Sequence, residues 1–241
     1  MAGKLKFEWN ALNYLTHVEW ASKPWFKRYQ DTETGYLQTL RDLPLRNVID
    51  AGAGSGRIFR EVAPRVKSLV AVDLADNMLD ALRAHAKAYS NIIVVKGDYT
   101  RLDDVLRKES LLSKTDNPLV VCLQNSLGTT KGSMWKAVSE FRKVAEPRDG
   151  DIVVSVFNSE ALEEYGLPLY KELEGMVGPV DSERTDTNAG VFASKTGYFS
   201  QWFTPQLRAE LKEKLDGTVL TEIRAPQFTV IHVTYSARGA E

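Results

Sequence analysis

A glycine-rich turn that contains one acidic residue carries the strongest chemical signal in the sequence. It spans residues 50–56, Asp-Ala-Gly-Ala-Gly-Ser-Gly, and joins a short apolar run to a helix-length segment. Glycines let a backbone turn tightly and approach a ligand, and the unpaired N–H groups at the helix start would face that ligand. The dinucleotide-binding fingerprint G-x-G-x-x-G would require glycine where Arg57 stands. Because the Asp50 carboxylate would repel a pyrophosphate, the turn favours a ligand that carries positive charge.

Three further polar groups follow apolar runs farther along the chain. In chain order they are Asp73, Asp98-Tyr99 and Gln124-Asn125. Taken singly, Asp73 could cap the next helix and Asp98 could be an ordinary turn residue. Open α/β sheets bind ligands at the carboxyl ends of their strands, so the joint spacing of these groups predicts one shared site.

Apolar runs of strand length alternate with amphipathic runs of helix length, which predicts an α/β fold with a doubly wound, mostly parallel sheet. Five parallel strands are expected, at 47–50, 68–73, 91–95, 119–123 and 151–157. Thr204 and Pro205 begin a later helix, because a capping hydroxyl precedes a proline in the first turn. Two more strand-like runs, 218–223 and 228–235, are joined by a connection too short for a parallel crossover. The sequence therefore predicts a seven-stranded sheet that ends in an antiparallel strand pair.

The organisation predicted for the chain is a single domain, 1–241, with two segments outside the sheet. The four expected parts are an N-terminal helical cap at 1–45, a ligand-binding core at 46–157, an inserted lid at 158–203, and a helix with the terminal strand pair at 204–241. No repeat or linker-like stretch divides these parts.

Composition and charge argue against several classes of protein. Lys and Arg number 31 against 32 Asp and Glu, a net charge of -1 that is unlike a dedicated nucleic-acid-binding protein. No apolar run approaches the roughly 18–20 residues of a membrane span, and the first ten residues lack a signal-peptide stretch. The single cysteine, Cys122, suits a reducing compartment, and no Cys/His cluster has metal-ligand spacing. We expect a cytoplasmic protein without nucleic-acid, membrane or metal partners, of undetermined oligomeric state.

The 50–56 turn resembles motif I of the class I, Rossmann-like S-adenosylmethionine (SAM)-dependent methyltransferases. The resemblance covers residues 45–157 well and the terminal strand pair loosely. It implies that Asp73 bonds the ribose hydroxyls of SAM, that Asp98 meets the adenine amine, and that Gln124 lies near the reacting methyl group. The SAM-binding residues expected from it are Asp50, Gly52, Ala53, Gly54, Gly56, Asp73, Leu74, Met78, Asp98, Tyr99, Gln124 and Asn125, with Arg28 as the partner of the SAM carboxylate.

The acceptor is expected to be a small molecule. The N/D-P-P-Y/F tetrapeptide that similar enzymes use for amide or base nitrogens is missing, and Gln124-Asn125-Ser126 takes its place. Methyl transfer would then be an in-line displacement in an enclosed pocket, in which the protein supplies positioning. The catalytic candidates are Asn125, Tyr170 and His17, the last as a base. The acceptor-side candidates are Trp20, Trp25, Tyr29, Asn158, Tyr198 and Trp202. A ring among the N-terminal ones, Trp20, Trp25 and Tyr29, could also face a sulfonium.

Two other hypotheses about the function stay open. Attack at a different sulfonium carbon would give 3-amino-3-carboxypropyl transfer, or intramolecular cyclisation of SAM to azetidine-2-carboxylate, with release of methylthioadenosine. SAM itself would be the only substrate of the cyclisation. A catalytically inert SAM-binding partner subunit is the third reading, and it predicts binding without turnover.

Replacing Asp73 or Asp50 by alanine should abolish SAM binding and leave the fold intact, because both carboxylates belong to the motif positions that would hold SAM. Isothermal titration calorimetry on the folded variants measures the effect. Unchanged affinity in either variant would contradict the motif assignment.

Overall fold

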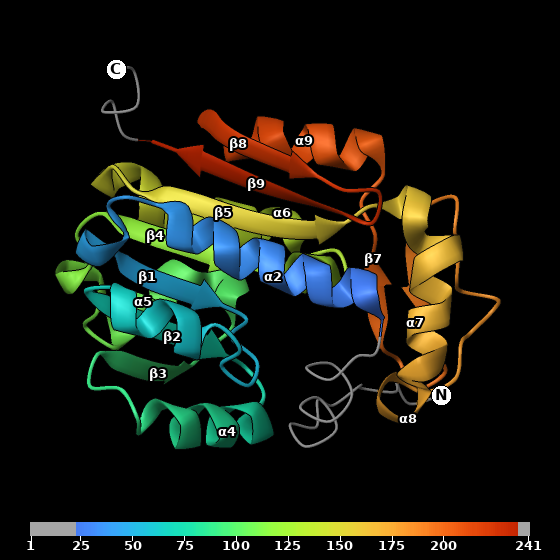
Figure 1. Ribbon diagram of the computed structural model, residues 1–241, viewed down its shortest axis with the longest axis horizontal. Coiled ribbons are helices and arrows are strands. Elements are labelled where there is room, and N and C mark those ends of the chain that lie inside the picture. Colours follow the sequence, from blue (N-terminus) through green and yellow to red (C-terminus); the bar gives the residue numbers. More distant parts are fainter. Residues whose placement is uncertain (1–22, 236–241) are drawn as a thin grey trace.

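The computed structural model describes residues 23–235, which form a seven-stranded sheet with helices on both faces (Figure 1). The strand order is β3-β2-β1-β4-β5-β9-β8. Strands β1 to β5 are mutually parallel, and β9 runs antiparallel to both of its neighbours. The strands are β1 (Asn47–Ala51), β2 (Ser68–Asp73), β3 (Ile92–Lys96), β4 (Pro118–Cys122), β5 (Asp151–Phe157), β8 (Thr218–Arg224) and β9 (Phe228–Thr234). The predicted fold class is confirmed, and the strand bounds agree with the expected ones to within one residue.

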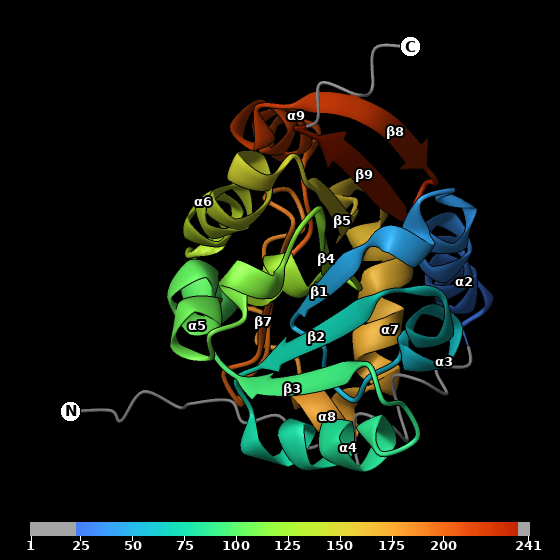
Figure 2. The same ribbon diagram turned by 90° about the vertical axis from the view of Figure 1, so that its left-hand side faces the viewer.

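Two layers of helices cover the sheet, as Figure 2 shows. One face packs against α2 (Pro24–Thr39), α3 (Phe59–Val62) and α4 (Asp76–Ala86). The other face packs against α5 (Leu102–Lys108), α6 (Met134–Ala145) and α9 (Pro205–Leu215). Strands β1, β4 and β5 are buried along their whole length, as expected for parallel strands covered on both sides. No helix within 23–235 is long and apolar enough to cross a membrane.

The lid, residues 158–203, lies beyond the carboxyl ends of the strands (Figure 1). It begins with a 3-10 turn (Ser159–Ala161) and a π-helical turn (Leu162–Gly166). Two short helices follow, α7 (Leu167–Glu172) and α8 (Glu174–Val177), and then the antiparallel pair β6 (Val191–Ala193) and β7 (Phe199–Gln201). Its position makes the lid a wall for whatever binds at this edge of the sheet.

Helix α2 is held to the edge of the sheet through a buried carboxylate. Pro24 occupies the first turn, where a missing N–H costs nothing, and the buried side chains recur at helical spacing. One of them is Glu33, which receives Arg57 Nη2 at 2.5 Å and the Gln124 N–H at 2.6 Å, and which also accepts from the Ser155 hydroxyl. Tyr29 bonds Ser155 at 2.8 Å through its hydroxyl. One helix thus fixes the glycine-rich turn, the end of β4 and strand β5.

Replacing Glu33 by alanine should lower the free energy of unfolding by about 3–5 kcal/mol, because it removes the fully buried partner of the ion pair with Arg57. Chemical denaturation measures the change. Asp31→Ala is the matched control, since it breaks an exposed ion pair with Lys27 on the same helix and should alter stability little. Equal small effects of the two substitutions would contradict the structural role of Glu33.

Candidate active site

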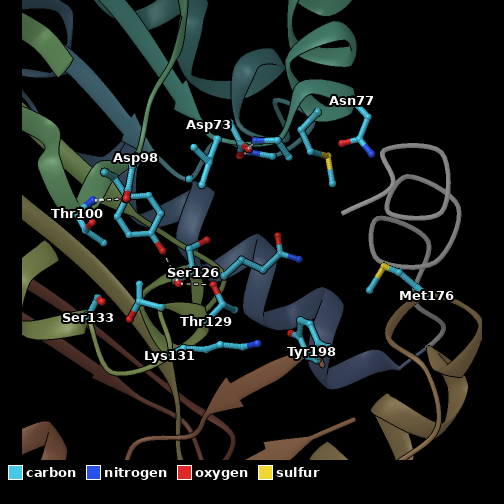
Figure 3. A pocket seen from close by; sticks show the side chains of 18 of the residues that line it. Asp73, Asn77, Asp98, Thr100, Ser126, Thr129, Lys131, Ser133, Met176 and Tyr198 are labelled. Atoms are coloured by element: carbon cyan, nitrogen blue, oxygen red, sulfur yellow. Dashed lines mark hydrogen bonds between the residues drawn. The ribbon is translucent and has the colours of Figure 1, made fainter. Parts of the chain in front are cut away.

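A cavity of about 710 Å³ lies between the carboxyl edge of the sheet and the lid (Figure 3). Its volume lies in the range of small-molecule sites, roughly 300–1,000 Å³. Loops after β1, β2, β3 and β4 form one side, and α2, β5 and the lid form the other. Ten of the predicted site residues line it: Gly52, Gly54, Asp73, Leu74, Met78, Asp98, Tyr99, Gln124, Tyr170 and Tyr198.

Asp73 is fixed by the backbone on both sides of it. One carboxylate oxygen accepts the Gly54 N–H and the other accepts the Ala75 N–H, each at 2.9 Å. Burial raises the pKa of Asp73, and these N–H groups oppose the shift. The bond to Gly54 also sets the path of the glycine-rich turn, so the carboxylate and the turn form one rigid wall.

Glycine is required at position 52 for two reasons. Its φ of +87° lies in the left-handed region, and a Cβ there would come within 3.2 Å of Ser126 and of the Tyr99 ring. Tyr99 in turn donates from its hydroxyl to the Ser126 carbonyl at 2.7 Å, which joins the loops after β3 and β4. The backbone at Gly52 therefore forms a narrow cradle that a side chain would fill.

The residues on this side of the cavity fit SAM. We call Gly52, Gly54, Asp73, Leu74 and Asp98 the donor half; it combines a glycine cradle, two carboxylates and an exposed apolar side chain, with Leu74 62% exposed. SAM carries a positive ammonium and sulfonium, ribose hydroxyls and a flat adenine. Carboxylates suit its charges and hydroxyls, and exposed apolar surface suits its base.

Three expected SAM-binding residues lie outside the cavity lining, in or next to the glycine-rich turn. Asp50 is buried, and burial raises its pKa to about 7 while the nearby Arg57 opposes the shift. Gly56 serves packing, because a Cβ there would meet the Phe59 ring at 2.8 Å. Ala53 belongs to the apolar core. These three residues shape the turn from the side away from the cavity. From there, a charged Asp50 would act on a bound ligand without touching it.

The opposite side of the cavity is apolar. Its walls come from α2, the end of β5 and the lid. The residues of these walls are called the lid half: Phe26, Phe157, Leu169, Tyr170, Leu173, Met176 and Tyr198. The Tyr170 hydroxyl accepts the Trp202 indole N–H at 2.9 Å, its ring stacks on Phe192, and burial raises its pKa to about 12. Tyr170 reaches the cavity as a wall residue with its hydroxyl already engaged.

The Asn125 side chain does not reach the cavity. Its amide donates to the Ser200 hydroxyl and to the Gln201 carbonyl, both at 3.1 Å, and its oxygen accepts the Phe157 N–H at 3.0 Å. Asn125 therefore ties the end of β4 to β5 and to β7 of the lid. Its own backbone is left-handed, with φ of 56°, a conformation that asparagine adopts more readily than most residues.

Several predicted acceptor residues form an aromatic cluster behind the lid half. Trp25 makes an edge contact with Phe157, and Trp202 packs on Phe157 with ring centroids 4.6 Å apart. Tyr29 is fully buried, and its hydroxyl accepts the Asn125 N–H at 3.0 Å. None of Trp25, Tyr29 and Trp202 is a cavity-lining residue, so the structure assigns them to support of the wall.

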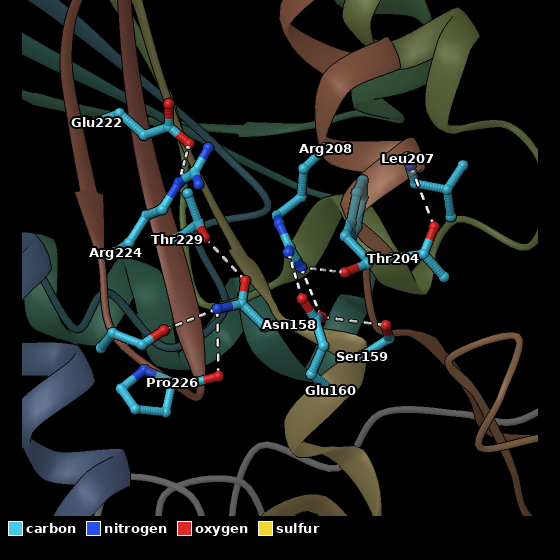
Figure 4. A network of polar contacts seen from close by, with 12 residues as sticks. Asn158, Ser159, Glu160, Thr204, Leu207, Arg208, Glu222, Arg224, Pro226 and Thr229 are labelled. Carbon is cyan, nitrogen blue, oxygen red and sulfur yellow. Dashed lines mark hydrogen bonds and ion pairs between the residues drawn. The ribbon is translucent and has the colours of Figure 1, made fainter.

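Two other predicted residues point elsewhere. Arg28 is exposed and donates to the Gln227 side chain at 3.2 Å, away from the cavity. Asn158 lies in the polar network of Figure 4, where its amide donates to the Ala225 carbonyl at 2.8 Å and its oxygen accepts from the Thr229 hydroxyl at 2.8 Å. Asn158 thus fastens the lid to the β8–β9 turn and borders a smaller cavity. His17 and Trp20 lie outside the described residues.

Sequence reasoning missed residues that reach the cavity from the loop before α6 and from the short helices of the lid. They are Thr129, Thr130, Lys131 and Ser133 before α6, and Leu169, Leu173 and Met176 in the lid. It also missed Glu33, whose only signal is an acidic residue on the buried stripe of an amphipathic helix. The loop residues carry no motif, and their place depends on how the lid folds back.

Comparison with family models matches residues 48–148 to a methyltransferase domain. The match begins in β1 and ends just before β5, so it contains the glycine-rich turn and the loops of the donor half. Comparison with the sequences of curated proteins finds no match.

Solved structures of methyltransferases resemble the chain along most of its length. The CcbJ methyltransferase of Streptomyces caelestis is 19% identical, with a TM-score of 0.58 over 86% of this chain and 90% of that one. The 1,6-didemethyltoxoflavin-N1-methyltransferase of Burkholderia thailandensis, bound to S-adenosylhomocysteine, is 17% identical, with a TM-score of 0.59 over 94% of this chain and 88% of that one. The magnesium protoporphyrin IX methyltransferase of Synechocystis, bound to SAM, is 13% identical, with a TM-score of 0.54 over 87% of this chain and 79% of that one. At these identities the likeness concerns the fold.

The chain thus contains a methyltransferase domain at residues 48–148, and its fold is that of solved methyltransferases. The methyltransferase domain indicates a transferase. Two of the similar structures hold S-adenosylhomocysteine or SAM.

The affinity for SAM should rise with pH up to about 7, by up to about tenfold per pH unit, because a charged Asp50 attracts the positive groups of SAM and a protonated one does not. The same raised pKa makes the unliganded fold lose stability as pH rises toward 7, since the folded state holds the proton more tightly. Calorimetric titration from about pH 5.5 to about 7.5 tests the affinity. The Asp50→Asn variant keeps the shape of the side chain but has no carboxyl group to titrate, so it corrects for the ionisation of SAM itself. Equal slopes of SAM affinity against pH in the variant and the wild type would contradict the role of Asp50.

Proposed function

We propose that this methyltransferase transfers the methyl group of SAM to a small organic acceptor bound against the lid. The observation that carries the proposal is the division of one cavity into a carboxylate-bearing donor half and an apolar lid half. A cationic donor and an apolar acceptor would sort themselves into these halves by charge and by hydrophobicity. The volume of about 710 Å³ suits two small molecules rather than a macromolecular segment.

The donor half would hold SAM through residues that the fold has already positioned. Asp73 would bond the ribose hydroxyls and Asp98 the adenine amine, as the sequence resemblance implies. Backbone N–H groups orient both carboxylates, since Asp98 accepts the Thr100 N–H at 2.8 Å as Asp73 accepts that of Gly54. When bound, SAM supplies an electrophilic methyl group for in-line displacement.

The lid half would orient the acceptor and exclude water from it. Phe26, Phe157 and Leu173 contribute apolar surface to the cavity, which favours a flat or apolar acceptor. Tyr170 is unsuited to act as a base near neutral pH, because its hydroxyl is hydrogen-bonded and its pKa lies near 12. An acceptor atom that is nucleophilic without a base from the lid fits this wall best, and His17 stays a prediction as a base.

Two of the similar structures support a small acceptor. One is described as acting on 1,6-didemethyltoxoflavin, with that molecule bound, and the other as a magnesium protoporphyrin IX methyltransferase. Both acceptors are flat ring systems, which agrees with an apolar, aromatic-walled half-cavity in this chain.

Purified protein incubated with SAM and a metabolite extract should form S-adenosylhomocysteine together with a product heavier than its precursor by one methylene. Mass spectrometry detects both molecules and identifies the acceptor. Asp73→Ala is the control for background hydrolysis, since it removes a donor-half carboxylate and should form neither molecule above the protein-free level.

Other products would contradict the proposal in different ways. Methylthioadenosine above the protein-free level, formed without extract, would mean cyclisation of SAM; formed only with extract, it would mean aminocarboxypropyl transfer. Tight SAM binding without any product would support an inert partner subunit instead.

A further inference from the structure

Lys131 is the cationic residue among the described residues that line the cavity. It follows the 3-10 turn Ser126–Thr129 and precedes α6. Its amine donates to the Gly197 carbonyl of the lid at 2.6 Å. Figure 3 shows the side chain directed toward Tyr198, on the lid side and away from Asp73 and Asp98. The positive charge therefore belongs to the acceptor region of the cavity.

The backbone at Lys131 is held in an unfavourable conformation. Its φ of 45° is left-handed, and Gly132 continues the left-handed path with φ of 86°. A non-glycine residue in this region costs on the order of 1 kcal/mol, and such strain gathers at binding and catalytic sites. A glycine at 131 would remove the strain, so the presence of lysine there indicates a use for its side chain.

The charges around the cavity are divided between its two ends. Asp73 and Asp98 lie in the donor half, and the third carboxylate, Asp76, is paired with Lys96 at 2.5 Å. In the proposed binding mode the first two carboxylates hold the ribose hydroxyls and the adenine amine of SAM. Among the residues that the structure describes, Lys131 forms no ion pair, and its amine donates to the Gly197 carbonyl.

We propose that Lys131 binds an anionic group of the acceptor, so that the acceptor is an organic anion with an apolar or aromatic body. An ammonium has three donors, and the Gly197 carbonyl takes one of them. The remaining two can hold a carboxylate, sulfonate or phosphate through charge-assisted hydrogen bonds. The apolar body lies against Phe157 and Leu173, and the anionic end turns toward the rim of the cavity. This inference rests on the proposed methyl transfer.

The probe is a metabolite extract divided on a strong anion exchanger into a retained fraction and an unretained fraction. Each is incubated with SAM and the wild-type protein, Lys131→Gln, Lys131→Arg or Lys136→Gln. Glutamine keeps a donor for the Gly197 carbonyl and removes the charge, whereas arginine keeps both. Lys136 is the matched control, because it is exposed on α6 and lies outside the cavity.

Formation of S-adenosylhomocysteine should require the retained fraction. At limiting acceptor, Lys131→Gln should slow it by about tenfold or more, with the Kd for SAM unchanged in calorimetry. Lys131→Arg should recover most of the rate, and Lys136→Gln should match the wild type.

Activity confined to the unretained fraction, or an equal rate in Lys131→Gln, would overturn the anionic-acceptor inference while methyl transfer stands. A fall in SAM affinity equal to the fall in rate would overturn it as well, because the lysine would then serve the donor half or the fold. Absence of S-adenosylhomocysteine with both fractions would overturn the proposed function and this inference together.

Discussion

The buried carboxylate of Glu33 is the contact on which the geometry of the cavity depends. Removing a carboxylate from water is costly, and here Arg57, the Gln124 N–H and the Ser155 hydroxyl offset that cost together. These three partners belong to three different segments around the site. Because Gln124 has a φ of 53°, it stands in a strained conformation that the bond to Glu33 helps to hold. Helix α2 is thus part of the active-site scaffold, although it lies outside the matched domain.

The division of charge across the cavity is the basis of the proposal that one site binds two different molecules. Backbone N–H groups hold Asp73 and Asp98 at the sheet edge, where the proposed binding mode places the ribose and the adenine of SAM. The lid contributes apolar and aromatic surface, with Lys131 at its border. Asn125 connects the two sides, because its side chain bonds β5 and β7 at once. The spacing between the two halves of the cavity therefore depends on hydrogen bonds made outside the cavity lining.

The strands and the motif positions followed directly from local pattern. Continuous apolar runs mark the buried strands, and the residues that follow them meet at one edge because parallel strands end together. The lid was less predictable, since its short helices and hairpin pack on each other through contacts between distant positions. Asn158 and Arg28 have residue types that suit a ligand, yet both satisfy their hydrogen bonds at the β8–β9 turn. Lys131 has no sequence signal, because only the folded lid brings Gly197 to its amine.

The most direct test of this account is a crystal structure of the protein with S-adenosylhomocysteine. The account predicts that the ribose hydroxyls lie on the Asp73 carboxylate and that the adenine lies beside Asp98 and Tyr99. The sulfur should face the lid half. Electron density for the ligand in the smaller cavity beside Asn158, or a nucleoside turned end for end with its adenine against Phe157, would contradict the assignment of the two halves.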